Sequence, residues 1–385
     1  MIKINFLVDN KYFLVDNKYF LVDNKYFLVD NCFILVDNQV MHQSTLEIRK
    51  KIIDALRSDI VDLNNYIQRQ FNISRQAVNK HLRALEEEGF LTSFGKTKNK
   101  NYQLGEIRQQ SKIIKLDKKI DEFDVYSQDF EWVVENAPKN IQEIVDWGFT
   151  EILNNAIDHA QAKIVFIVLS IKEKELFLTI CDDGEGIFNR IKRIKDFDSD
   201  QRVVLELSKG KLTTDDENHT GLDIFFSIEA FDFFAIYSNN HLYNFNNNTE
   251  INLEKYGFEK VFKMGDDLGF STAVRMSIKL SSTTKLKDVF DKFAKAPEFE
   301  FDTTIVSLYL VNEKQNLVSR SQAKQATNRL EEFKFVTFDF KGIGSIGQGF
   351  ADELFRVYPN KNPQISFDYV NADVEVEKMI KRVKK

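Results

Sequence analysis

The stretch that most limits how this chain can fold runs from Gly148 to Phe188 and reads GFTEILNNAIDHAQAKIVFIVLSIKEKELFLTICDDGEGIF. In its first part, apolar residues recur at helical spacing. Two runs rich in Ile, Leu and Val follow over residues 163–171 and 176–181, joined by a Lys-Glu-Lys-Glu turn. This pattern predicts a helix followed by a β-hairpin.

Acidic and amide side chains occupy one face of the predicted helix and the end of the second predicted strand. Glu151 and Asn155 are four residues apart, so they share a helix face, and Asp158 and His159 follow one turn later. The second strand ends in Asp-Asp-Gly-Glu-Gly, starting at Asp182. A carboxylate beside two glycines lets a ligand ring approach the backbone closely and accepts a hydrogen bond from an exocyclic amine. We therefore expect a ligand pocket here.

This combination resembles the GHKL ATPase family, which includes gyrase, MutL, the histidine kinases and the heat-shock chaperones of that group. The family's N-box has the form E-x-x-x-N-A, and its first glycine box has the form D-x-G-x-G. Both boxes are present, separated by the predicted hairpin, and the matching residues are Glu151, Asn155, Ala156, Asp182, Gly184 and Gly186. The resemblance implies a GHKL α/β sandwich over residues 123–285.

The resemblance also implies the ligands, ATP and Mg²⁺, and the roles of the matched residues. Asn155 would coordinate the Mg²⁺ that bridges the phosphates, with Asp158 and His159 beside the nucleotide. Asp182 would hold the adenine amino group, and the two glycines would lie against the ring. Glu151 would be the catalytic residue that orients or deprotonates the attacking nucleophile.

Two later segments match the same family in part. KGKLTTDDENHTGLDIFF resembles the ATP lid and second glycine box, where His219, Thr220 and Gly221 would lie near the phosphates. Asp223 replaces the usual second glycine, and a carboxylate there would repel triphosphate or weaken lid closure. STAVRMSI resembles the closing strand of the fold, where Thr272 would support the carboxylate that holds adenine.

Other interpretations of this region stay open. It is also consistent with an α/β sandwich in which Glu151 and Asp182 are only surface acids. A histidine kinase needs a phosphoacceptor histidine on a dimerisation helix before the ATPase region, and none of the five histidines lies in such a context. The closer resemblance is to the smaller anti-sigma-factor kinases, which phosphorylate serine.

Residues 44–104 show helical periodicity followed by a predicted hairpin. An apolar helix starts near Thr45, and a second short helix fits residues 60–71. NISRQAVNKHLRALEEEGFL then predicts a third helix, with Ser74 as its N-cap and Gly89 at its end. LTSFGKTKNKNYQL predicts two strands around a basic tip. This order resembles the winged helix-turn-helix family of bacterial regulators.

The charge of residues 44–104 favours double-stranded DNA as a partner. Eleven Lys or Arg stand against seven Asp or Glu, a net charge of +4, whereas the whole chain carries −6. The outer face of the third helix and the hairpin tip carry donors suited to base edges and phosphates. The predicted DNA-binding residues are Arg75, Gln76, Asn79, Lys80, Arg83, Lys96, Lys98 and Lys100. The alternative is a winged-helix module used only for protein contact.

Residues 298–385 predict a small α/β domain, reading helix, buried strand, glycine-rich turn, helix and strand. This segment resembles the STAS-like domain of unknown function that often follows GHKL modules, and more distantly the anti-sigma-factor antagonists. Antagonists accept phosphate on a serine that aligns near Gln348, which has no hydroxyl, and Ser345 is the only serine close by. We therefore expect a domain for interaction or dimerisation.

The N-terminal segment, residues 1–40, is built from a seven-residue repeat, whose five units begin with LVDNKYF at Leu7 and end at Met41. Each unit predicts a short strand followed by an Asp-Asn turn. Seven codons correspond to about 21 base pairs, roughly two turns of B-DNA, so repeated DNA would present one face of the duplex. One hypothesis is that Met41 is the true start and that the repeat is translated upstream DNA. The other is an authentic N-terminal extension.

The composition is that of a multidomain α+β protein, and we expect it in the cytoplasm. Hydrophobic residues make up 43% of the chain, yet no run is long enough to span a membrane. Two cysteines and five histidines show no metal-ligand spacing. Residues 105–122 are expected to be a charged linker.

These features together predict an ATP-binding transcriptional regulator. Nucleotide binding would gate contact with DNA or with a partner protein, such as an antagonist or a sigma-like factor, and we expect a homodimer without a membrane partner. The alternatives are a serine/threonine protein kinase of the anti-sigma-factor type and a degenerate ATPase kept as a scaffold.

Overall fold

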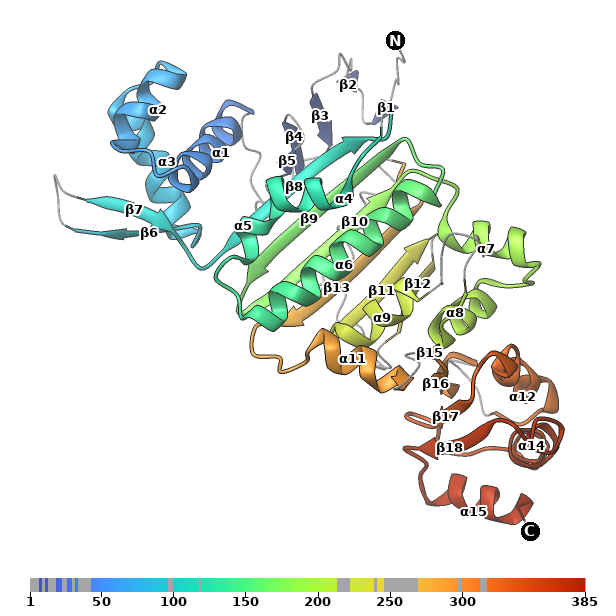
Figure 1. Ribbon diagram of the computed structural model, residues 1–385. Coiled ribbons are helices and arrows are strands. Elements are labelled where there is room, and N and C mark those ends of the chain that lie inside the picture. The colour runs from blue at the N-terminus through green and yellow to red at the C-terminus, as the bar shows by residue number, and fades with distance from the viewer. Residues whose placement is uncertain are drawn as a thin grey trace. The chain divides into compact units, whose positions relative to one another are not determined.

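Figure 1 shows the computed structural model, in which the protein is a multidomain chain of helices and mixed sheets. It divides into two compact units, Met1–Asn136 with Ile164–Thr179, and Ala137–Lys163 with Ile180–Lys385. Among the residues described, no helix is both long and apolar enough to cross a membrane. The described residues are 7–8, 11–12, 19–22, 26–29, 32–33, 43–95, 100–117, 119–212, 222–238, 241–245, 269–295, 300–311 and 317–384.

Three helices and a hairpin follow one another in the order that the sequence predicts for residues 44–104. Ser74 caps the third helix, because its hydroxyl accepts a hydrogen bond from the backbone N–H of Ala77. The chain leaves this helix at Gly89, whose φ of +83° suits glycine. The predicted cap and helix end are therefore confirmed. The elements are α1 (Gln43–Arg57), α2 (Leu63–Phe71), α3 (Arg75–Glu87), β6 (Leu91–Phe94) and β7 (Asn101–Leu104).

Helix α2 begins at Leu63 rather than at Ile60, where the sequence predicts its start. The side chain of Asp62 accepts a hydrogen bond from the backbone N–H of Asn65 and so caps the helix at this point. An apolar core joins the three helices to the hairpin. Its buried members are Ile48, Ile52, Ile67, Val78, Leu82, Leu85 and Leu91.

The segment predicted as a charged linker contains a long strand, so this prediction is wrong for residues 108–115. Strand β8 (Arg108–Lys115) pairs antiparallel with β9 (Ile164–Lys172), from Arg108 opposite Ile171 to Lys115 opposite Ile164. Polar and apolar residues mix along β8, and its Ser111 and Ile114 are buried. Short helical segments follow at Glu122–Val125 (α4), Tyr126–Phe130 (a π-helical turn) and Glu131–Val134 (α5).

The largest sheet has six strands in the order β12-β11-β13-β10-β9-β8. β11 pairs antiparallel with β12, which follows it in the sequence, and with β13 on its other side. The predicted hairpin of residues 163–171 and 176–181 is confirmed by β9 and β10. The remaining strands are β10 (Glu175–Asp182), β11 (Phe233–Ser238), β12 (His241–Asn244) and β13 (Thr272–Lys279).

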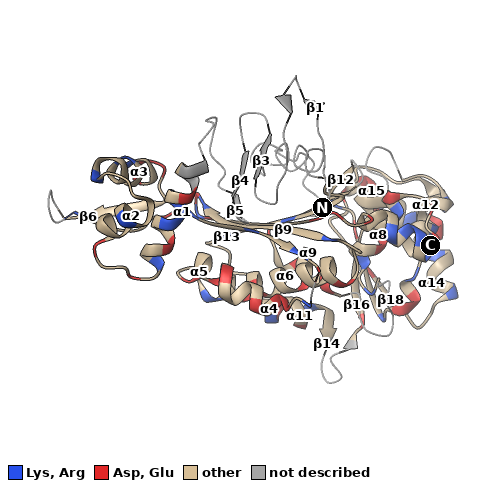
Figure 2. Ribbon diagram, turned by 90° about the horizontal axis from the view of Figure 1, so that it is seen from above, with Lys and Arg blue, Asp and Glu red and all other residues tan. Residues whose placement is uncertain are grey.

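Three helices of the second unit lie on the same side of the sheet, as Figure 2 shows from above. They are α6 (Lys139–Asp158), α9 (Asp223–Ala230) and α11 (Leu286–Phe293). A Cβ atom at Gly148 of α6 would lie 2.5 Å from the ring of Phe231, so glycine permits the close approach of α6 to this ring. Two further helices, α7 (Ile187–Lys195) and α8 (Asp200–Lys209), follow β10.

The C-terminal part forms a separate three-stranded parallel sheet in the order β16-β17-β18. The predicted order of helix, strand, glycine-rich turn, helix and strand is confirmed, and β16 adds a strand before it. The strands are β16 (Thr303–Ser307), β17 (Phe335–Asp339) and β18 (Ser366–Val370). The helices are α12 (Arg320–Thr327), α13 (Gln348–Asp352), α14 (Tyr358–Lys361) and α15 (Val374–Val383).

The described parts of the N-terminal repeat are short strands. Four of the five fall on the Lys-Tyr-Phe-Leu-Val part of the repeat, where the strand is predicted, and the fifth is Cys32–Phe33, whereas the Asp-Asn pairs lie outside the described residues. Strand β3 pairs antiparallel with β4, which pairs antiparallel with β5. The strands are β1 (Leu7–Val8), β2 (Lys11–Tyr12), β3 (Tyr19–Val22), β4 (Tyr26–Val29) and β5 (Cys32–Phe33).

Candidate functional site

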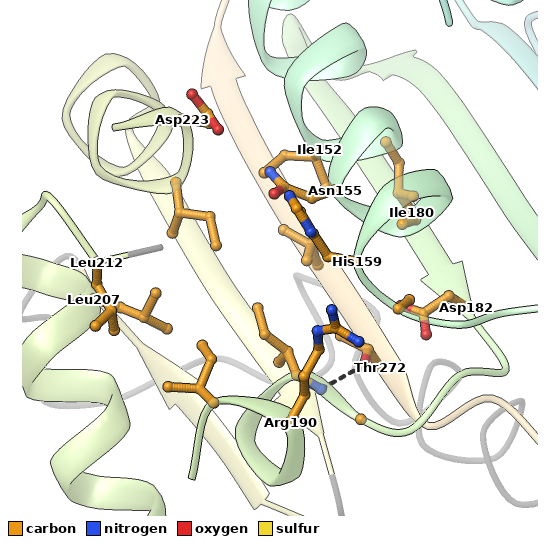
Figure 3. Close-up of a pocket in the computed structure, with 17 residues that line it drawn as sticks. Ile152, Asn155, His159, Ile180, Asp182, Arg190, Leu207, Leu212, Asp223 and Thr272 are labelled. Atoms are coloured by element: carbon orange, nitrogen blue, oxygen red, sulfur yellow. Dashed lines mark hydrogen bonds between the residues drawn. The ribbon is translucent and has the colours of Figure 1, made fainter. Parts of the chain in front are cut away.

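A cavity in the second unit brings together residues that the sequence singles out from four separate segments (Figure 3). The cavity is partly open to solvent. Most of its wall is Ile, Leu, Val and Ala. The polar residues that line it are Asn155, His159, Asp182, Arg190, Asp223 and Thr272. A mainly apolar wall with a few convergent polar groups is typical of a small-molecule site.

Helix α6 contributes one wall of the cavity. The Nδ2 atom of Asn155 donates to the backbone oxygen of Glu151 at 2.9 Å, which leaves the Asn155 side-chain oxygen for a ligand or a cation. His159, at the C-terminal end of α6, also lines the cavity. Glu151 and Asp158 are not among the lining residues, and Asp158 is exposed. Helix geometry therefore brings only two of the four predicted α6 residues to the cavity.

Asp182 ends β10 at the opposite wall, and only 6% of its surface is exposed. Burial raises the pKa of its carboxyl to about 6, and a hydrogen bond from the Gly184 N–H at 3.0 Å opposes this shift. The side chains of Thr272 and Ser271 also donate to this carboxyl. Asp182 is thus a buried acceptor, fixed from three directions, at the edge of an apolar cavity.

The two glycines after Asp182 are required by the backbone. A Cβ atom at Gly184 would lie 2.1 Å from the backbone oxygen of Ala160, closer than any real contact. Gly186 adopts a φ of +89° just before α7 begins, a conformation that other residues rarely adopt. Gly186 lines the cavity, whereas Gly184 stands behind Asp182 and orients it through its N–H.

Thr272 begins β13 and connects two sides of the cavity. Its side chain donates to the Asp182 carboxyl, and its Oγ1 accepts a hydrogen bond from the Ile187 N–H at 3.1 Å. Ile187 is the first residue of α7, where backbone N–H groups have no partner within the helix. Thr272 therefore contacts the Asp182 carboxylate and also anchors the start of α7.

Besides Asp182, two described charged residues line the cavity, and the sequence analysis identified only one of them, Asp223. Arg190 lies on α7, within a run of basic and apolar residues that reads as an ordinary solvated helix face. Asp223, identified as a departure from the second glycine box, lines the cavity at the start of α9. His219, Thr220 and Gly221 lie outside the described residues. Within the described part, no cluster of His, Cys, Asp and Glu could hold a metal ion.

Helix α8 connects the cavity to the C-terminal domain through a buried charge network. The Glu206 carboxylate accepts hydrogen bonds from Lys209 Nζ at 3.1 Å, from Asn328 Nδ2 at 3.2 Å and from Arg329 Nη1 at 3.4 Å. Lys209 Nζ also donates to the backbone oxygens of Gln325 at 3.1 Å and Asn328 at 2.9 Å. Neither the Glu206 nor the Lys209 side chain is exposed. Sequence reasoning missed this network because Glu206 and Lys209 look like a surface pair.

The predicted DNA-reading face of α3 is exposed throughout its described residues, Arg75, Gln76, Asn79, Lys80 and Arg83. Figure 2 colours the ribbon blue at the Lys and Arg residues of this region. Asn79 accepts a hydrogen bond from Asn64 at 2.7 Å, and Lys100 forms an ion pair with Glu86 at 2.8 Å. Lys96 and Lys98 lie outside the described residues.

The turn that follows β17 contains exposed Ser345, and exposed Gln348 begins α13. No hydroxyl therefore stands at the position where antagonists carry their phosphoacceptor. A Cβ atom at Gly347 would lie 2.7 Å from the backbone of Val318, so this glycine permits the chain to turn into α13 against its neighbour.

Comparison with known proteins identifies one part of the chain. Residues 322–377 match a family described as the STAS-like domain of unknown function (DUF4325). No curated protein matches the chain. The matched residues span α12, β17, α13, α14, β18 and part of α15, which is the order that the sequence predicts for this segment. The C-terminal part of the chain is therefore a STAS-like domain.

Proposed function

We propose that this protein is an ATP-binding transcriptional regulator, in which a nucleotide in the cavity of the second unit controls contacts with DNA or with a partner protein. In this proposal, residues 123–285 are a GHKL domain, and residues 44–104 are a winged helix-turn-helix. The STAS-like domain at the C-terminus serves as the surface for a partner or for a second copy of the chain.

The observation that carries the proposal is the meeting of Asn155, Asp182 and Thr272 around one cavity. These residues come from segments far apart in the sequence, and each has the chemistry that its predicted role needs. Asp182 offers a buried acceptor for an amino group, at the edge of a mainly apolar cavity that suits the flat ring of a base. The Asn155 oxygen offers a ligand to Mg²⁺, which prefers oxygen ligands and keeps several of its waters.

The geometry favours nucleotide binding over hydrolysis. Glu151, the predicted catalytic residue, is not among the cavity-lining residues, whereas the Asp223 carboxylate lines the wall. A carboxylate repels the negatively charged triphosphate, so it opposes the placement of the phosphates that in-line attack needs. A serine/threonine kinase and an inactive scaffold are the two alternatives, and the same two residues weigh against the kinase.

Helix α8 provides the route by which the cavity would influence the C-terminal domain. Leu207 of α8 lines the cavity, and Glu206 and Lys209 of the same helix bind Asn328 of the STAS-like domain. A ligand shifts a conformational equilibrium only by its difference in affinity between the two states. A useful coupling here requires a difference of about 1 to 3 kcal/mol.

Incubation of the full chain with radiolabelled ATP and Mg²⁺ tests the proposal. Retention of label by the protein without release of phosphate supports a nucleotide-binding switch. Label transferred to a second protein would instead identify a kinase, and absence of binding would leave only the scaffold. A gel shift on DNA from the upstream region, with and without ATP and Mg²⁺, then tests whether the nucleotide controls DNA binding.

A further inference from the structure

Arg190 is a cation whose hydrogen-bonding needs are not met within the described chain. Its Nε and Nη1 atoms have almost no exposed surface, and neither has a hydrogen-bond partner among the described residues. The guanidinium points into the cavity, in the region between Thr272 and His159 (Figure 3). Buried donors without partners are rare in folded proteins and call for an explanation at each site.

The nearby carboxylates are already engaged. Glu185 lies close enough to feel the Arg190 charge, but both of its oxygens accept hydrogen bonds from Arg193, at 2.8 and 2.7 Å. Asp182 accepts from the Gly184 N–H at 3.0 Å, and it also accepts from side chains beside it. No described carboxylate lies within ion-pairing distance of Arg190. Its partner must therefore come from outside the described chain.

The chemistry of a guanidinium limits what this partner can be. Arginine stays protonated at every physiological pH, so only an anion neutralises its charge. The Nε–H and Nη1–H groups leave the guanidinium in different directions, so one oxygen atom cannot satisfy both. A phosphate carries several charged oxygens and makes short, strong hydrogen bonds with arginine.

We propose that Arg190 binds a phosphate group of the nucleotide and thereby makes the cavity select nucleotides over nucleosides. This inference rests on the proposed nucleotide-binding function. Arg190 is the only Lys or Arg among the described residues that line the cavity. The Asp182 and Asp223 carboxylates repel an anion and the apolar wall suits the base, whereas the guanidinium attracts a phosphate.

Isothermal calorimetry of the full chain with adenosine, AMP, ADP and ATP tests this assignment. The variants are Arg190→Gln and, as a matched control on the same helix, Arg193→Gln, which removes an exposed arginine paired with Glu185. We expect Arg190→Gln to weaken binding of the phosphorylated ligands by about 10- to 100-fold and to leave adenosine binding unchanged. Arg193→Gln should leave all four affinities unchanged.

Thermal unfolding of the unliganded protein provides a second readout. Because Arg190 has buried donors without partners, Arg190→Gln should leave the unfolding temperature unchanged or raise it. A variant that fails to fold would show that Arg190 is structural and would overturn the assignment. An equal loss of adenosine and ATP affinity would also overturn it, because Arg190 would then contact the base.

The wild-type protein separates failure of the inference from failure of the proposed function. If wild type binds adenosine and ATP with the same affinity, no phosphate is recognised and the role of Arg190 is refuted, while the base site stands. If wild type binds none of the four ligands, the proposed function itself fails, and the assignment of Arg190 falls with it.

Discussion

Lys209 Nζ lies 3.1 Å from Glu206 Oε1, and neither side chain is exposed to solvent. Burial lowers the pKa of Lys209 to about 8, and the Glu206 carboxylate opposes this shift. The pair lies on α8, a helix that borders the cavity at Leu207 and binds the STAS-like domain at Asn328. Because this buried ion pair also contacts Asn328, the contact between α8 and the STAS-like domain should be sensitive to any movement of α8.

Loss of the acid from this pair should destabilise the second unit. In Glu206→Ala, the Lys209 ammonium and the Arg329 guanidinium lose their buried carboxylate, and an uncompensated buried charge costs about 3 to 5 kcal/mol. Urea denaturation followed by circular dichroism measures this loss. Limited proteolysis should also cleave the connection before α12 faster in the variant.

Two further variants test whether the charge of the pair is the cause. Glu377→Ala removes a partly exposed acid that pairs with Lys381 at 2.9 Å, and it should change stability by less than about 1 kcal/mol. Replacing both Glu206 and Lys209 with Met removes the fully buried ammonium together with its partner and should recover part of the loss, because the Arg329 guanidinium keeps its ion pair with Glu332 at 2.9 Å. If Glu206→Ala were as stable as Glu377→Ala, the buried network would not hold α8 and the STAS-like domain together.

Gly184 should not tolerate a side chain. Gly184→Ala places a Cβ atom 2.1 Å from the Ala160 backbone oxygen, so the turn after Asp182 must move. We expect a loss of at least about 1 to 3 kcal/mol in stability together with loss of nucleotide binding, because the Gly184 N–H orients the carboxylate. Gly344→Ala is the control, since nothing lies within 4 Å of its Cβ position. A stable, nucleotide-binding Gly184→Ala protein would contradict the described turn.

Nucleotide affinity should depend on the ionisation of Asp182. Its carboxyl has a pKa of about 6, and only the ionised form accepts a hydrogen bond from an amino group without presenting a competing proton. Affinity should therefore rise with pH up to about 6, by up to about tenfold per pH unit, and level off above it. Calorimetry between about pH 5 and pH 8 measures this profile.

Two variants identify the group responsible for the pH profile. Asp182→Asn should bind weakly and without this dependence, whereas His159→Gln, which alters a titratable side chain at the end of α6 that also lines the cavity, should keep it. If instead His159→Gln lost the pH dependence of affinity and Asp182→Asn kept it, the dependence would be assigned to His159.

The raised pKa of Asp182 should also make stability depend on pH, but stability should fall with rising pH whereas nucleotide affinity rises. The folded-state pKa of Asp182 lies above the ordinary value of 3.8, so between these two values the folded protein binds more protons than the unfolded chain. The contribution of Asp182 to stability should therefore be lost as pH rises from about 4 to about 6. Thermal unfolding of wild type and Asp182→Asn over this range should show the difference, and parallel curves would contradict the buried carboxyl.

The outer face of α3 should carry DNA binding. Arg75 and Lys80 are exposed there, and Arg75→Ala with Lys80→Ala should abolish binding of upstream DNA in a gel shift. Wild-type affinity should fall steeply with salt, because phosphate contacts release counterions. Lys172→Ala with Lys174→Ala removes the same charge from an exposed turn elsewhere and should leave binding intact. Equal affinities of the two double variants would show that α3 is not the reading helix.

The sequence was sufficient to predict those features of the structure that depend on interactions between neighbouring residues. Ser74 and Gly89 mark the ends of α3 because caps act within one turn of the helix. Asn155 and Asp182 reach the same cavity because each stands at a fixed place on a helix or strand whose type the sequence predicts.

The features that the sequence did not predict depend on distant partners. Strand β8 resembles a polar linker until β9, about fifty residues later, supplies its hydrogen bonds. Arg190 resembles a solvated helix residue, because only the folded cavity buries its donors. Glu206 and Lys209 have the spacing of an ordinary surface pair, and the STAS-like domain, more than a hundred residues later, turns them into a buried network.

The most direct test of the account is calorimetric titration of the full chain with ATP in the presence of Mg²⁺. The comparison is wild type against a double variant carrying Asp182→Ala and Asn155→Ala, with folding of both proteins checked by circular dichroism. We predict saturable binding at one site per chain in wild type and its loss in the folded double variant. Absence of heat in wild type, or equal affinity in the two proteins, would contradict a nucleotide site at this cavity.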